Sequence, residues 1–81
     1  MAKQVKPHKR TYRIIRHDLL TSLASGQKNI NQLANTSGIN WKTTQNHLIY
    51  LCGFRFARVV VNLPQVKIYE ITERGMEELA K

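Results

Sequence analysis

The sequence predicts a small α+β domain in which three helices precede a two-stranded hairpin and a closing helix. Before residue 53, apolar residues recur every three or four positions, which is the spacing of one helical face. After residue 53 the spacing falls to two and β-branched residues become frequent, as in strands. The 81 residues suffice for one domain with one core, and 42% of them are hydrophobic, so the chain is expected to fold.

The first helix is expected over residues 11–25. Tyr12, Ile15, Leu19 and Leu23 are three and four positions apart, so they share one face and are predicted to line the core. Gly26 follows the last of these positions, and glycine is typical of a helix end.

A short second helix and a longer third helix are separated by a turn. Asn29 and Asn40 are suited to cap helices over residues 30–36 and 41–52, because an Asn side chain accepts a hydrogen bond from an unpaired amide of the first turn. Gly38 suits the left-handed conformation in the turn between them. Two helices joined in this way form a helix–turn–helix unit.

The hairpin strands are expected over residues 54–63 and 66–71. Pro64 marks the turn, because it has no N–H to donate to a ladder. Apolar side chains fall on both faces of this hairpin. Either the second face is covered by the first or the last helix, or it is exposed and invites a protein partner. Thr72 then caps a final helix over residues 73–81.

The charge of the chain is strongly and unevenly positive. Thirteen Lys and Arg stand against five Asp and Glu, a net charge of +8, and Asp18 is the only acid before Glu70. Such a balance indicates a polyanionic partner, since solubility alone does not require so few acids. Residues 1–10 are expected to form a flexible basic arm in front of a single domain over residues 11–81.

The third helix is expected to be amphipathic, with an unusual polar side. Trp41, Thr44, Leu48 and Leu51 form one stripe, which is assigned to the core. The other side carries mostly amides and hydroxyls, in residue types that are poorer helix formers than Glu, Lys or Arg. Asn and Gln can pair with adenine through two hydrogen bonds, and Thr can touch the thymine methyl group. The residues expected to read bases in a major groove are therefore Asn40, Lys42, Thr43, Gln45, Asn46 and His47.

Two stretches of the chain resemble a known family. The segment INQLANTSGINWKTTQNHLIYLCGF, followed by a hairpin and YEITERG, resembles winged helix–turn–helix regulators of the ArsR and MarR kind, and small archaeal winged-helix proteins more closely still. The resemblance covers roughly residues 11–81. It implies a winged helix–turn–helix fold with a three-helix core, a two-stranded wing and a C-terminal helix. It also implies a homodimeric transcription regulator whose third helix enters the major groove of double-stranded DNA.

Phosphate contacts are expected from the basic residues of the arm, the first helix and the wing, and such contacts make affinity fall with salt. These residues are Lys3, Lys6, Lys9, Arg10, Arg13, Arg16, Arg55, Arg58 and Lys67. The wing tip, NLPQ, departs from the Arg- or Gly-rich tip of the family, with only Lys67 nearby.

Several other classes of function are disfavoured. Cys52 is the only cysteine and no Cys/His cluster has zinc spacing, so neither a metal nor another cofactor is expected. No carboxylate pair, catalytic triad or phosphate-binding loop suggests an enzyme. The absence of a signal-like or membrane-spanning run favours a cytoplasmic, nucleoid-associated protein without membrane contact. Two alternatives to a sequence-specific regulator stay open: a protein-interaction module that docks through the hairpin, and a non-specific architectural chromatin protein.

Overall fold

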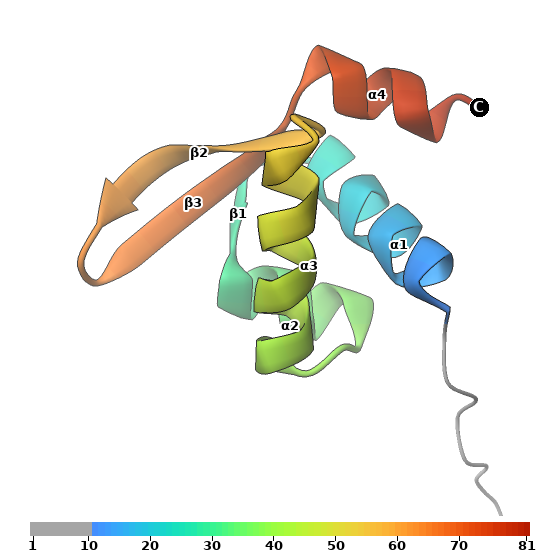
Figure 1. Ribbon diagram of the computed structural model, residues 1–81. Coiled ribbons are helices and arrows are strands. Elements are labelled where there is room, and N and C mark those ends of the chain that lie inside the picture. The colour runs from blue at the N-terminus through green and yellow to red at the C-terminus, as the bar shows by residue number, and fades with distance from the viewer. Residues whose placement is uncertain (1–10) are drawn as a thin grey trace, which may run out of the picture.

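The computed structural model describes residues 11–81, in four helices and three strands (Figure 1). The α+β class and the order of the expected elements are confirmed. The structure adds one strand, β1, that the sequence pattern does not indicate. The basic arm, with Lys3, Lys6, Lys9 and Arg10, lies outside the described residues. The elements are α1 (Tyr12–Ala24), β1 (Lys28–Asn29), α2 (Ile30–Ser37), α3 (Trp41–Gly53), β2 (Ala57–Leu63), β3 (Val66–Ile71) and α4 (Glu73–Leu79).

Each helix begins at a side-chain cap. The side chains of Thr11, Asn29, Asn40 and Thr72 each accept a hydrogen bond from the backbone amide three positions later. The last three caps confirm the sequence-based assignments. At α2, the Gln32 side chain also accepts a hydrogen bond from the Asn29 amide, which completes a capping box. The polar residues before each helix therefore fix where it starts.

The turn between α2 and α3 depends on one glycine. Gly38 has φ 68° and ψ 29°, the left-handed conformation that the sequence predicts for it. Its amide donates to the Ala34 carbonyl, and the next amide, of Ile39, donates to the same carbonyl. This turn sets the direction in which α3 leaves α2.

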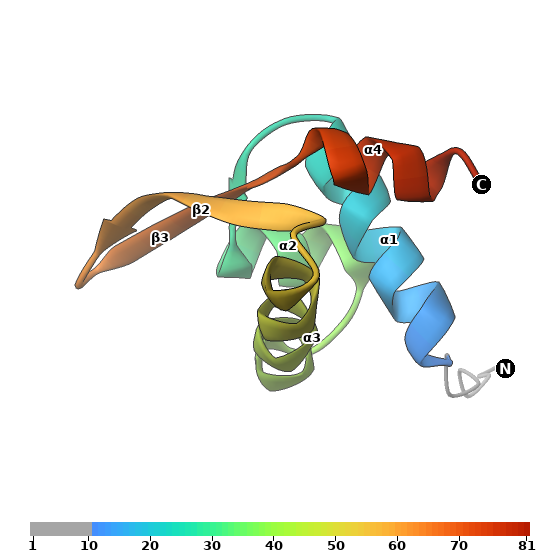
Figure 2. The same ribbon diagram turned by 45° about the horizontal axis from the view of Figure 1, so that its top comes forward.

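The sheet is antiparallel with strand order β1-β3-β2, and β2 and β3 form the expected hairpin. The β2–β3 hairpin projects away from the helices (Figure 2). Its register runs from Ala57 opposite Ile71 to Leu63 opposite Val66, with one irregularity after Val59. β1 pairs with β3 through Lys28 opposite Tyr69, so the segment between α1 and α2 is tied to the base of the hairpin.

The core lies where α1, α2 and α3 meet under the base of the sheet. Leu19, Leu23, Leu33, Leu48 and Leu51 are almost completely buried, which confirms the expected faces of α1 and α3. These side chains supply most of the apolar burial that stabilises so small a domain. The half-buried Cys52 packs at the edge of this core, and burial raises the pKa of its thiol.

Two aromatic residues that the sequence assigns to the core are exposed instead. Tyr12 is 67% exposed and Trp41 is 46% exposed. Each is the first residue of its helix. Periodicity gives the direction of a side chain but not how far along the helix its neighbours reach, so terminal positions of a stripe are misassigned first.

The outer part of the hairpin is also open. Val59 and Val60 are 38% and 37% exposed, and Leu63 at the tip is 54% exposed. The second apolar face of the hairpin was expected to be either covered by a helix or exposed, and at these residues it is exposed. Burial is confined to the base, at Ala57 and Tyr69.

Candidate nucleic-acid interface

One side of α3 faces the core, and within residues 11–81 the opposite side is mostly exposed. Thr44, His47, Leu48 and Leu51 are the buried residues of α3. The Thr44 hydroxyl donates to the Asn40 carbonyl at 2.8 Å, so this buried polar group is satisfied within the helix. The placement of α3 leaves its remaining polar residues outward.

The outward side of α3 carries what we call the exposed row, Lys42, Gln45, Asn46 and Ile49. Gln45 and Asn46 are adjacent, and each lies three or four positions from Lys42 and from Ile49, so the four residues share one face, and none is acidic. Lys42, Asn46 and Ile49 are exposed and Gln45 is half-buried. Ile49 is 68% exposed, although an isoleucine next to Leu48 is expected to be buried. Its spacing from Asn46 and Gln45 is the signal that identifies it.

Asn40 and Thr43 lie at the start of α3 but are not part of the exposed row. The Asn40 Oδ1 atom accepts a hydrogen bond from the Thr43 backbone amide at 2.8 Å, so this side-chain oxygen is already used to cap α3. Thr43 is half-buried and lies beside the exposed row. Both residues border the row and neither is central to it.

The structure corrects the placement of His47. Its side chain is only 6% exposed and lies on the α1 side of α3, next to the Thr44 and Leu48 positions. Burial, and then the positive charge of Arg16, hold the pKa of His47 below its ordinary value. His47 is therefore a packing residue between α1 and α3, and it does not belong to the outward set.

Arg16, expected to contact phosphate, is also engaged inside the protein. Its Nε donates to His47 Nδ1 at 3.3 Å, and its guanidinium carbon lies 3.4 Å from the centroid of the Tyr50 ring and 5.3 Å from that of Tyr12. Such cation–π contacts hold a guanidinium against an aromatic face. Arg16 therefore links α1 to α3, and its guanidinium is already engaged by His47 and the two aromatic rings.

Among residues 11–81, no group of three or more His, Cys, Asp and Glu side chains is placed to hold a metal ion. Within the same residues, none of the helices has both the length and the apolarity needed to cross a bilayer.

Comparison with known proteins gives structural matches but no sequence family. No protein-family model matches the chain, and no curated protein matches it. Sso10a-2, a DNA-binding protein from Sulfolobus solfataricus, is 26% identical with a TM-score of 0.75, over 89% of this chain and 73% of that one. A MarR family transcriptional regulator from Silicibacter pomeroyi is 25% identical with a TM-score of 0.70, over 78% and 42%. The transcriptional regulator BldR from Sulfolobus solfataricus is 17% identical with a TM-score of 0.76, over 83% and 50%.

The chain has the winged helix–turn–helix fold of MarR-type regulators. In this winged-helix chain, α2 and α3 with their turn are the helix–turn–helix, and β2 and β3 are the wing. The chain spans about half the length of BldR and of the DNA-binding protein BpsR from Bordetella bronchiseptica, 50% and 48% respectively.

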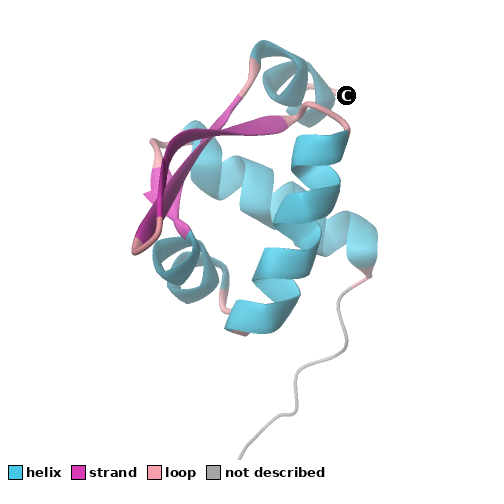
Figure 3. Cartoon of the chain, turned by 60° about the vertical axis from the view of Figure 1, so that its left-hand side comes forward, coloured by secondary structure: helices cyan, strands magenta, loops and turns pink. Residues whose placement is uncertain are grey.

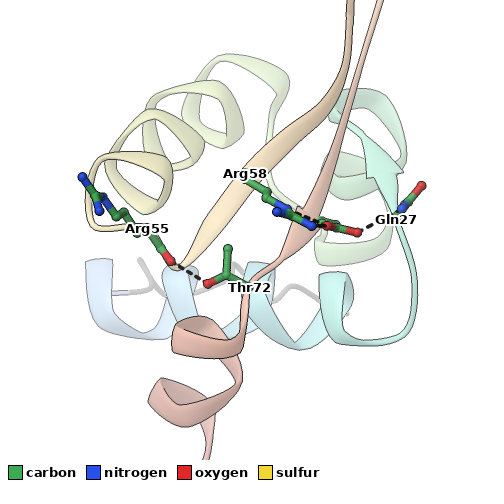
Figure 4. Close-up of polar contacts among 5 residues, drawn as sticks. Gln27, Arg55, Arg58 and Thr72 are labelled. Carbon is green, nitrogen blue, oxygen red and sulfur yellow. Dashed lines mark hydrogen bonds and ion pairs between the residues drawn. The ribbon is translucent and has the colours of Figure 1, made fainter.

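The base of the wing holds Arg58 in a three-residue network (Figure 4). The Arg58 Nε donates to one Glu70 carboxylate oxygen at 2.6 Å, and the Gln27 side-chain amide donates to the other at 3.0 Å. The hydrogen bond from Arg58 and, to a smaller extent, that from Gln27 hold the pKa of Glu70 below its ordinary value. The Arg58 side chain is still 67% exposed, so a phosphate would have to compete with Glu70 for it.

Arg55 occupies the sharp turn between α3 and the wing. Its φ is 63°, in the left-handed region, and its carbonyl accepts a hydrogen bond from the Thr72 hydroxyl (Figure 4). Because Thr72 also caps α4, this contact joins the end of α3 to the start of α4. The Arg55 side chain itself is exposed, as are those of Arg13 and Lys67. Within the described part of the chain these three cations form no ion pair.

Proposed function

We propose that this winged-helix chain is a sequence-specific double-stranded DNA-binding transcription regulator, with α3 inserted in the major groove. The exposed row is the observation that carries the proposal. A three-turn helix presenting Lys42, Gln45, Asn46 and Ile49, without an acid, matches the donors, acceptors and methyl groups of base-pair edges. A helix face that only contacts water is more often built from Glu, Lys and Arg.

The charge and the comparisons support the same class of partner. The net charge of +8 suits a polyanion, and the printed descriptions of Sso10a-2 and BldR are of a DNA-binding protein and a transcriptional regulator. These relatives are regulators or DNA-binding proteins, in agreement with the expectation that the chain is not an enzyme. Such a protein would act in the cytoplasm at the nucleoid.

The phosphate contacts proposed for the described residues are revised by the geometry. Arg13, Lys42, Arg55 and Lys67 are exposed cations that can reach a DNA backbone. Arg58 joins them only when it leaves Glu70. Lys3, Lys6, Lys9 and Arg10 of the arm complete the proposed set from the sequence alone. Each phosphate contact releases counterions, so affinity should fall steeply as salt rises.

The first test is a titration of a labelled mixed-sequence duplex at two salt concentrations, followed by anisotropy. We expect binding at low salt that weakens strongly at higher salt. Selection of bound sites from random oligonucleotides then tests specificity. Absence of binding at low salt would remove the proposal, and binding without any selected site would leave DNA binding but remove sequence-specific regulation.

Two alternatives have an observation in their favour. The exposed Val59, Val60 and Leu63 of the wing favour a protein-interaction module, which predicts a stable protein partner and weak DNA binding. The match to Sso10a-2, whose description names DNA binding without regulation, favours a general DNA-binding protein, and the architectural alternative predicts tight binding with little sequence preference. The selection experiment separates both from a regulator.

A homodimer is part of the proposal, with α1 and α4 as the candidate interface. Ile14 on α1 and Met76 on α4 are 50% and 49% exposed, so both helices offer apolar surface. Sedimentation equilibrium should show a dimer that Ile14→Lys weakens. A monomer at all concentrations used for DNA binding would remove this part of the proposal.

A further inference from the structure

A cluster of four side chains joins α1 to α3. In Figure 3, α1 crosses behind α3. The Arg16 Nε atom donates to His47 Nδ1 at 3.3 Å, and the guanidinium carbon lies 3.4 Å from the centroid of the Tyr50 ring. The centroid of the Tyr12 ring lies 5.3 Å from the same carbon and 5.1 Å from the centroid of the His47 ring. We call these four residues the Arg16 cluster, in which a neutral imidazole and two phenol rings hold a permanently charged side chain.

The Arg16 cluster depends on the neutral form of His47. An imidazole that has gained a proton has no acceptor left, so the hydrogen bond from Arg16 is lost. The imidazole also becomes a cation beside the guanidinium, at a side chain that is only 6% exposed, and like charges repel strongly where water is excluded. Because Arg16 ends in a long and flexible side chain whereas His47 is buried, Arg16 is the partner that moves.

Few other ionisable groups face His47. From α1 it meets Arg16 and Tyr12, and α3 itself contributes Tyr50, which contacts the same guanidinium. The neighbouring α2 contains no ionisable side chain, and β2 contributes Arg58, which is held in the ion pair at the base of the wing. Burial and then Arg16 lower the pKa of His47 from its ordinary value of 6.5, so His47 gains its proton only below pH 6.5.

We propose that the Arg16 cluster is a pH switch for DNA binding, in which protonation of His47 releases Arg16 to contact a DNA phosphate. The proposal rests on the proposed function, because it needs a duplex held against α3. At neutral pH the guanidinium stays on the Tyr50 ring and contributes no phosphate contact. In acid it joins the exposed cations of the DNA-binding side, and affinity rises.

The position of the Arg16 cluster places the released side chain near this duplex. Tyr50 lies four positions after Asn46 of the exposed row, so the ring that supports the guanidinium borders the row. Arg13 lies three positions before Arg16 on α1 and is already an exposed cation. A DNA strand contacted by Arg13 therefore passes close to the released Arg16.

The dependence of binding on both pH and salt tests the switch. The chain contains three histidines, so His8→Gln combined with His17→Gln gives a variant in which His47 is the only histidine. The affinity of this single-histidine variant for a labelled mixed-sequence duplex is measured by anisotropy over a series of salt concentrations, at about pH 7 and about pH 5. We expect the slope of log affinity against log salt to be steeper by about 1 at the lower pH, because one more cation contacts a phosphate. Circular dichroism at both pH values confirms that the protein is folded.

Two further substitutions in the single-histidine variant identify the source of the change. His47→Gln keeps an acceptor for Arg16 but cannot titrate, so its slope should be the same at both pH values. Arg16→Ala leaves His47 able to titrate but removes the released cation, so it too should show one slope.

The outcomes separate the switch from the proposed function. A folded single-histidine variant with one slope at both pH values, or a pH-dependent slope that persists after Arg16→Ala, would overturn the switch and leave the proposed function intact. Absence of binding at either pH at low salt would overturn the proposed function itself.

Discussion

Arg16 on α1 donates a hydrogen bond from Nε to Nδ1 of His47 on α3, over a distance of 3.3 Å. The accepting nitrogen must be unprotonated, so this bond exists only while the imidazole is neutral. The Tyr12 ring lies against the imidazole in an edge arrangement, with 5.1 Å between centroids. The helix that carries the exposed row is therefore fastened to α1 through a group that can titrate.

The first prediction concerns acid stability. The pKa of His47 is lowered by burial and by Arg16, from an ordinary value of 6.5. The unfolded chain therefore binds this proton more readily than the folded chain does. Stability from this source is complete above pH 6.5 and is lost as the pH falls below 6.5, until the folded-state pKa is reached. Thermal unfolding followed by circular dichroism should show a melting temperature that falls over this range.

Two histidine variants provide the comparison. His47→Gln keeps an acceptor for Arg16 but does not titrate, so the fall of the melting temperature below pH 6.5 should be reduced. His17→Gln changes an exposed histidine and should retain the parental pH dependence. An equal pH dependence in all three proteins would show that His47 is not the source.

The second prediction concerns Gly75, in the first turn of α4. A Cβ atom at this position would lie 2.1 Å from the Phe56 carbonyl oxygen and 2.6 Å from the Ile71 side chain. The backbone of the turn must move to admit it, so Gly75→Ala should destabilise the fold by about 1–3 kcal/mol. Gly53→Ala is a matched control, because a Cβ there meets nothing within 4 Å, and it should stabilise by about 0.4–1 kcal/mol. Urea unfolding of both variants measures the two values, and equal stabilities would contradict the packing argument.

Much of this fold follows from local chemistry and is therefore visible in the sequence. The caps Asn29, Asn40 and Thr72 and the left-handed Gly38 act on neighbouring backbone groups, so their identity alone predicts the element boundaries. β1 is not predicted in this way. It has two residues, and only pairing with Tyr69 and Ile68, about forty positions away, makes it a strand.

The candidate site was less predictable, because exposure is decided by neighbouring elements. His47 and Ile49 are two positions apart. From polarity alone, His47 would be expected at the surface and Ile49 in the core, but the structure shows the reverse. His47 is buried because α1 supplies Arg16 as a partner, and Ile49 is exposed because none of the elements within residues 11–81 covers it. The sequence contains both residues but not the position of α1.

The third prediction concerns the ion pair between Arg58 and Glu70 at the base of the wing. Glu70→Gln removes the carboxylate that holds the guanidinium, which leaves Arg58 available to a phosphate. On a mixed-sequence duplex we expect tighter binding and a slope of log affinity against log salt that is steeper by about 1. The double variant with Arg58→Ala should lose the gain in slope. A Glu70→Gln variant with the parental slope would indicate that Arg58 does not face the DNA.

The last prediction assigns a base contact to Ile49. An exposed apolar side chain in a row of amides can pack against the C5-methyl group of thymine, which is the only apolar feature of the major-groove edge. Replacing thymine by deoxyuridine removes that methyl group and changes nothing else on the edge. On a duplex from the selection experiment, one such replacement should weaken binding by about 0.8 kcal/mol, or about four-fold. Ile49→Ala should bind the thymine and deoxyuridine duplexes equally, whereas Thr21→Ala, at an exposed position of α1, should keep the difference. If Ile49→Ala still prefers thymine at that position, the methyl group is recognised by another residue.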